Sequence, residues 1–150
     1  MAKYYAPLGA TTVTTDSSQD LWVIASPADA AVKLLWAKMS STVTSDERLL
    51  LSLIQRSGAG SAGGSALTVV AADGTSATVG TTVTPLVTTQ GTGTKTFTTD
   101  YWSQLSPWEW MPTPECVIVI PPSTYLALAL GTAVASTRTM TGYVCFEEIG

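Results

Sequence analysis

The sequence predicts an all-β protein, an antiparallel β-sandwich of the jelly-roll type. Its 150 residues are 45% hydrophobic, and the apolar residues occur in short runs rather than in one long stretch. Thr-rich segments at 81–84 and 94–99 alternate with these runs, and β-branched residues suit the half-buried surface of a sheet. About eight or nine short strands, separated by turn signals, are the pattern of a two-sheet sandwich.

The chain is expected to divide into an extended N-terminal arm, residues 1–20, and a single β-sandwich domain, residues 21–150. The lead-in is polar and carries few large apolar side chains. Its run of Thr and Val at 11–15 fits either an edge strand or an extended arm. The first clear strand, 21–25, ends at the turn signal Ser26-Pro27.

Residues 28–55 fit two periodicities. Val32, Leu34 and Trp36 would share one face of a strand, whereas other apolar residues between 28 and 39 recur at helical spacing. We favour a strand over 28–41, because no helix stop signal follows it. Residues 47–55 fit a buried strand and also a helix capped by Asp46.

The second half of the chain reads as further strands. Residues 57–65, all Gly, Ser or Ala, predict a long flexible loop, and Asp73-Gly74 predicts a hairpin turn. Further strands are expected at 95–102, 117–120, 124–130 and 138–147. In the last of these, Met140, Val144 and Phe146 are expected to face the core.

Composition argues against several function classes. The chain has no histidine, the usual group that titrates near neutral pH, so we expect no enzyme and no cofactor. A net charge of −4 with scattered basic residues predicts no nucleic-acid binding, and no apolar run has the length of a membrane span. A charged fraction of only 12% favours a subunit buried against neighbours, with a Thr-covered monomer as the alternative.

The two thiols, Cys116 and Cys145, lie in apolar runs. Buried, inert thiols are the favoured interpretation, and a disulfide is the alternative. Two thiols without histidine predict no metal site.

Two groups of carboxylates are candidates for a catalytic or ion-pairing role. Glu109, between two tryptophans, is a candidate acid with Glu115 as its partner, but an exposed Glu between inward Trp side chains is the simpler interpretation. Glu147 and Glu148 are expected to be a solvated chain end or ion-pair partners of a neighbour.

Aromatic side chains gather in one stretch of the sequence. Tyr101, Trp102, Trp108 and Trp110 fall within ten residues. Such a cluster fits the core of a small β-domain, a subunit interface or a carbohydrate-binding surface. Core is favoured, and a sugar site would require the tryptophans to lie exposed in a flat row.

The string WEWMPTPE at 108–115, followed by VIVIPP at 117–122 and MTGYVCFEEIG at 140–150, resembles the C-terminal half of small virion proteins of tailed bacteriophages. The similarity is weaker over 21–56. It implies a capsid decoration (cement) protein that forms a homotrimer, binds the major capsid protein and lies on the virion surface after synthesis in the host cytoplasm. It also implies architectural roles for five residues: Trp108, Trp110, Pro112, Pro114 and Glu115. A tail, collar or head-fibre subunit and a carbohydrate-binding host-attachment module are the alternatives.

Overall fold

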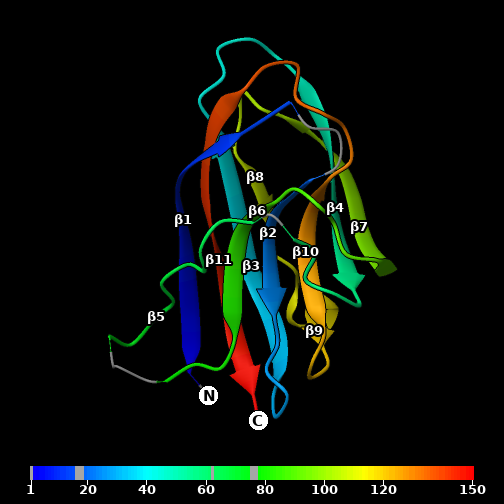
Figure 1. The fold of residues 1–150 in the computed structure, drawn as a ribbon. Helices are drawn as coiled ribbons and strands as arrows, with labels where there is room; N and C mark the ends of the chain where they lie inside the picture. Colours follow the sequence, from blue (N-terminus) through cyan, green and yellow to red (C-terminus); the bar gives the residue numbers. More distant parts are fainter. Residues whose placement is uncertain (1, 16–18, 62, 75–77) are drawn as a thin grey trace.

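Two antiparallel sheets packed face to face make up the protein (Figure 1). The computed structural model describes residues 2–15, 19–61, 63–74 and 78–150. The regular structure among these residues consists of strands and one short 3-10 helix, η1 (Pro114–Cys116). The predictions of an all-β chain and of a two-sheet sandwich are therefore confirmed.

The strands alternate between the two sheets from β1 to β6, after which β7 stays in the sheet of β6 and β8 and β9 share the other sheet. Sheet A has the order β5-β1-β11-β3-β8, with β9 also paired to β3, and sheet B has the order β6-β2-β10-β4-β7. The strands of sheet A are β1 (Lys3–Val13), β3 (Ala31–Ser41), β5 (Val70–Ala71), β8 (Trp108–Trp110), β9 (Ile118–Ile120) and β11 (Arg138–Ile149). Those of sheet B are β2 (Gln19–Ala25), β4 (Arg48–Arg56), β6 (Thr82–Val87), β7 (Gly93–Ser103) and β10 (Tyr125–Leu130).

The core lies between the sheets and follows the period-two pattern of strands. On β11, Met140, Val144 and Phe146 are buried as predicted, whereas Thr141 on the opposite face is exposed. On β2, Trp22 is fully buried and anchors the other sheet. The space between the sheets is filled by apolar side chains, because the alternate residues that each sheet turns inward are mostly apolar.

The N-terminal segment is a strand of the sandwich, so the prediction of an extended arm over 1–20 is wrong. β1 pairs with β11 from Lys3 to Val13, with one irregularity after Leu8. Tyr4, Ala6 and Leu8 point into the core and are at most 6% exposed. This alternation is weak in the sequence, because one of the inward positions is the small Ala6. Residue 1 and residues 16–18, which belong to the predicted arm, lie outside the described residues.

The segment with two periodicities is β-structure, and the helix alternatives are wrong. β3 covers 31–41 and β4 covers 48–56. In β4, Leu49, Leu51 and Leu53 are buried, and the strand is paired on both sides, with β10 and with β7. Leu50, on the opposite face, is only half-buried, so this strand has one face in the core and the other partly covered.

The Gly/Ser/Ala segment has no regular secondary structure and lies alongside β6. Ser61 bridges to Thr89, and the backbone N–H of Leu67 donates to the carbonyl of Val83 at 2.8 Å. Gly60 has φ of +76°, and a Cβ there would lie 2.2 Å from the Thr89 oxygen, so glycine is required. Residue 62, part of the predicted loop 57–65, lies outside the described residues.

The predicted Asp-Gly hairpin is only partly right. The N–H of Gly74 bonds to the carbonyl of Ala71 at 3.2 Å, and Gly74 has a positive φ of 72°, as a turn requires. However, β5 pairs with β1 and β6 pairs with β2, so the two strands that flank the turn do not pair with each other. Residues 75–77 lie outside the described residues.

Candidate interaction surfaces

The four aromatic residues singled out in the sequence have different environments. Trp102 and Trp108 belong to the core, with 3% and 7% exposure. The indole N–H of Trp102 donates to the carbonyl of Ser106 at 2.6 Å. Tyr101 is 75% exposed, and Trp110 is half-buried in a surface groove. The core interpretation is therefore right for two of the four, and they form no flat exposed row.

The groove lies between β7 and the segment that runs from β8 to β9, and we call it the edge groove. It has a volume of about 620 Å³. The Lys95 ammonium lies 5.0 Å from the centre of the Phe97 ring, a cation–π distance. Its other apolar lining comes from Trp110, Val117, Ile118 and Val119.

Exposed large apolar side chains are concentrated in one stretch of the sequence. Met111 is 71% exposed, Leu105 56% and Val119 46%, and all three lie with Tyr101 within 101–119. Val70, on the opposite edge of sheet A, is the other such residue among those described. Val119 and the half-buried Trp110 line the edge groove, and an apolar groove with exposed apolar lining indicates a contact with a partner.

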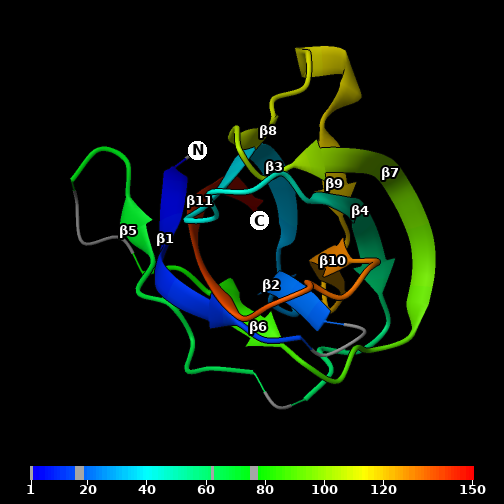
Figure 2. The ribbon, with the colours of Figure 1, turned by 90° about the horizontal axis from the view of Figure 1, so that it is seen from above.

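The segment between β8 and β9 extends away from the sandwich when the molecule is seen from above (Figure 2). It contains residues carried by the similarity: Pro112 lines the edge groove, Pro114 begins η1 and Glu115 is exposed. Glu109 points outward and lies 4.0 Å from the Lys38 ammonium, as the interpretation of an exposed Glu between inward Trp side chains expects.

A second aromatic group was missed in the sequence. Tyr5, Trp36 and Tyr143 lie on the outer surface of sheet A, and we call them the aromatic face. The ring centres of Trp36 and Tyr143 are 5.1 Å apart and those of Tyr5 and Tyr143 6.2 Å. Their positions on three strands scatter them through the sequence. The available signal was that each of them alternates with core residues on its own strand.

The rings of the aromatic face meet edge-on. The planes of Trp36 and Tyr143 are inclined by 87°, and those of Tyr5 and Tyr143 by 61°. Sugar rings stack on flat, parallel aromatic faces, so this arrangement does not fit a carbohydrate platform. All three are half-buried, and the buried indole nitrogen of Trp36 has no hydrogen-bond partner within the part of the chain that the structure describes. Such amphipathic rings are typical of protein contacts.

The two cysteines differ, and both are free thiols. Cys145 is 5% exposed and lies opposite Tyr5 and Trp36 on the aromatic face. Burial raises the pKa of the Cys145 thiol, and this thiol in turn raises the pKa of the Tyr5 hydroxyl. Cys116 is exposed at the end of η1, so the prediction that it is buried is wrong. The turn begun by Pro114 carries it out of the apolar run.

We expect the exposed thiol of Cys116 to react quickly with a maleimide at pH 7. The buried thiol of Cys145 should react about 100-fold more slowly, because only an exposed thiolate attacks the reagent. The Cys116→Ser variant should lose the fast phase, and the Cys145→Ser variant should keep it. Mass spectrometry of peptides from timed samples assigns each phase. Equal rates for both thiols in folded protein would contradict this assignment.

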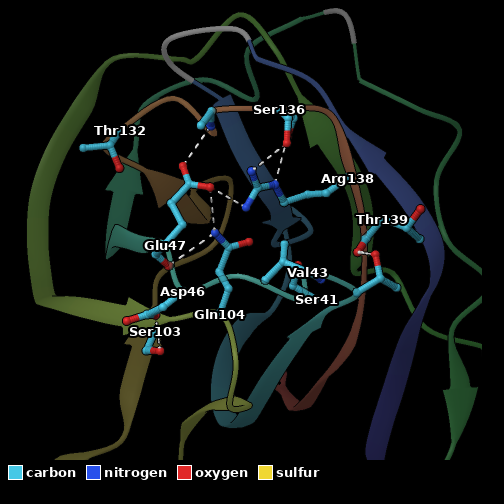
Figure 3. A network of polar contacts seen from close by, with 12 residues as sticks. Ser41, Val43, Asp46, Glu47, Ser103, Gln104, Thr132, Ser136, Arg138 and Thr139 are labelled. Atoms are coloured by element: carbon cyan, nitrogen blue, oxygen red, sulfur yellow. Dashed lines mark hydrogen bonds and ion pairs between the residues drawn. The ribbon is translucent and has the colours of Figure 1, made fainter.

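A polar network holds one end of the sandwich together (Figure 3). Glu47 forms an ion pair with Arg138 and accepts a hydrogen bond from the backbone N–H of Ala135 at 2.8 Å. The Arg138 guanidinium also donates to the Ser136 carbonyl at 2.9 Å. The Gln104 amide nitrogen lies 3.5 Å from the Glu47 carboxylate and links the loop between β7 and β8 to this network. Glu47 directly precedes β4, and Ala135 and Ser136 precede β11, so the network positions the loops that lead into these two strands.

A buried ion pair joins β2 to β4 and was not foreseen. The Arg56 guanidinium donates to the two carboxylate oxygens of Asp20 at 2.9 and 2.8 Å, and both residues are at most 5% exposed. The Gln90 amide donates to the same carboxylate at 2.8 Å, and Arg56 also donates to the carbonyl of Gly91 at 2.7 Å. Burial raises the pKa of Asp20, and its bonds to Arg56 and Gln90 oppose that rise.

The C-terminal carboxylates are bound within the fold, so the prediction of a solvated end is wrong. Glu147 is 8% exposed and lies 3.8 Å from the Lys33 ammonium of the neighbouring strand. Glu148 accepts hydrogen bonds from the backbone N–H of Thr81 at 2.9 Å and from its hydroxyl at 2.6 Å. These bonds fasten the start of β6 to the end of β11.

Within the described residues, no group of three or more His, Cys, Asp or Glu side chains could hold a metal ion. The same part of the chain contains no helix with the length and apolarity needed to cross a membrane. Comparison with known protein families, with curated proteins and with solved structures finds no match.

Proposed function

We propose that this chain is a non-enzymatic structural protein of a tailed-bacteriophage virion, a capsid decoration (cement) protein that forms a homotrimer and binds the major capsid protein. The observation that carries the proposal is the presence of two separate apolar surfaces. The edge groove lies at one open edge of the sandwich, and the aromatic face covers the outside of sheet A. A subunit that binds both its own copies and a shell needs two such surfaces.

The strand order supports a jelly-roll topology. Leaving out the short β5 and the neighbouring β6, the sheets read β1-β11-β3-β8 and β2-β10-β4-β7. Successive strands of the chain therefore cross from one sheet to the other, except from β4 to β7 and from β8 to β9, and all neighbours are antiparallel, as two interlocked Greek keys require. Jelly rolls are common in viral capsids and also in lectins, so topology supports the proposal by analogy alone.

Stabilisation of the shell would follow from mass action. A protein that binds the assembled shell, and not the separated subunits, shifts the equilibrium toward the shell. A trimer that binds at several points gains further affinity, because the second and third contacts form at high effective concentration. Half-buried aromatic side chains suit the trimer contact, and the edge groove suits contact with the shell.

The first test is the position of the chain in virions of the phage that encodes it. We expect cryo-electron microscopy of these virions to place the sandwich in fixed copy number on the head, and removal of the protein to lower the temperature at which heads release DNA. Density on the tail, collar or a head fibre would replace the proposal with the alternative of another virion part.

The homotrimer is tested separately by sedimentation equilibrium. We expect a mass three times the 15.6 kDa of the chain. A Trp36→Ser/Tyr143→Ser variant should weaken the trimer about 1,000-fold, because interface aromatic anchors each contribute about 2 kcal/mol or more and about 1.4 kcal/mol is tenfold in affinity. Tyr101→Ser, which removes an exposed ring away from the aromatic face, is the matched control. A monomeric wild-type chain at high concentration would exclude the trimer.

A further inference from the structure

The two sides of the sandwich where the sheets end differ in how their strand edges are covered. On one side, Ser61 and residues 63–72 run along β6 and then pair with β1, where the N–H of Ala72 donates to the Lys3 carbonyl at 2.8 Å. This segment links the edges of the two sheets. On the other side, β7 pairs with β4 alone, and β8 and β9 pair with β3 alone, as far as the described residues show. The edge groove lies between these unpaired edges.

An unpaired strand edge next to an apolar groove has the shape of a site for an extended chain. The backbone N–H and C=O groups on the free side of β7 offer hydrogen bonds, and the groove accepts alternate side chains of an added strand. The pairing of β7 with β4 is regular from Thr98 to Ser103 and irregular between Thr96 and Thr98. An added strand would therefore pair along 98–103, and the end of it next to Thr98 would place apolar side chains in the groove lined by Phe97 and Trp110.

Charged residues near the groove favour one kind of bound polypeptide over another. Asp100 lies two residues along β7 from Thr98, and Glu115 directly precedes Cys116; Thr98 and Cys116 both line the groove. Both acids are exposed, and no ion pair joins either to another described residue. Lys95 is the one base that lines the groove, and it lies over the Phe97 ring. A second copy of this chain would bring the same unpaired acids against these, whereas Lys or Arg side chains would neutralise them.

We propose that the edge groove binds an extended segment of another polypeptide, apolar at alternate positions and basic at its ends, as a strand added along β7. This inference rests on the proposed function and deepens it, because it names the kind of segment by which a shell protein would be held. Pairing along 98–103 gives affinity through backbone hydrogen bonds. The groove and its two acids give specificity for the sequence of the segment.

The probe is a short synthetic peptide of alternating Val and Thr with Lys at each end. We expect saturable binding in a tryptophan-fluorescence titration, together with slower hydrogen exchange at the amides of 98–103. The same peptide methylated on alternate backbone nitrogens should not bind, because it cannot complete the ladder. A peptide with Glu at each end should bind about tenfold more weakly, since it meets Asp100 and Glu115.

Two exposed valines of sheet A provide matched variants. Val119, 46% exposed, lines the edge groove, and Val70, 47% exposed, lies on β5 at the opposite edge. V119K should weaken binding of the Lys-ended peptide at least tenfold, and V70K should leave it unchanged. Thermal unfolding of both variants confirms that each remains folded.

The outcomes separate this inference from the proposed function. Equal effects of V119K and V70K, or equal affinity for the Lys-ended and Glu-ended peptides, would overturn the strand-addition site. A wild-type dimer that V119K converts to monomer would mean that a second copy fills the groove, which also overturns it. No peptide binding by a protein that still decorates heads would overturn only this inference. Peptide binding by a protein absent from virions would overturn only the proposed function.

Discussion

Replacement of Arg56 by Met is expected to lower the free energy of unfolding by about 3–5 kcal/mol, as measured by urea denaturation. Arg56 is 5% exposed and donates two hydrogen bonds to Asp20, which has no exposed surface. Without the guanidinium, the carboxylate loses both of these bonds and keeps the one from Gln90. It must then remain charged in the interior or take up a proton, and either state costs free energy.

The cost should spread beyond the pair. Arg56 also donates to the carbonyl of Gly91, in the turn between β6 and β7, and Gln90 from the same turn donates to Asp20. The pair therefore connects β2, β4 and this turn. We expect R56M to increase hydrogen exchange first at residues 88–93, because their backbone depends on this cluster.

A double-mutant cycle isolates the interaction. D20N alone should also destabilise the protein by several kcal/mol, because it leaves Arg56 buried and unpaired. The D20N/R56M protein should lose less than the sum of the two single losses, by about 0.5–3 kcal/mol. K38M removes the base of a surface pair with Glu109 and should cost only about 0–1 kcal/mol. A loss below about 1 kcal/mol for R56M would contradict a structural role for the pair.

Much of the sandwich could be predicted because most strands show their inward and outward faces in the alternation of residues along the sequence. Met140, Val144 and Phe146 alternate with polar residues, and this pattern alone places β11 with one face in the core. The strand at 31–41 could be separated from a helix because no stop signal follows it. β1 was missed because its inward positions include the small Ala6, which carries little hydrophobic signal.

The surfaces could not be predicted because they depend on pairing between distant strands. The sequence shows the cluster from Tyr101 to Trp110, yet the fold buries Trp102 and Trp108 and exposes Tyr101. Tyr5, Trp36 and Tyr143 become neighbours only through the registers of β1, β11 and β3. The Asp20–Arg56 pair likewise depends on which strands meet, and period-two reasoning carries no information about that.

Gly142→Ala is expected to destabilise the protein by about 1–3 kcal/mol, although it adds only one methyl group. A Cβ at this position would lie 2.0 Å from the carbonyl oxygen of Lys38 and 2.7 Å from the sulfur of Met39. The sulfur can move, but the carbonyl belongs to the backbone of β3. β11 is paired on both sides, with β1 and with β3, so it has little freedom to withdraw.

Gly9→Ala provides the control, because Gly9 lies on β1 of the same sheet and a Cβ there meets nothing within 4 Å. It should change stability by no more than about 0.5 kcal/mol. Since Tyr143 follows Gly142 directly, a displaced β11 also moves the aromatic face. G142A should therefore weaken the proposed trimer while G9A leaves it intact, measured by urea denaturation and sedimentation equilibrium. Equal stability of the two variants would mean that β3 and β11 separate more easily than their continuous pairing indicates.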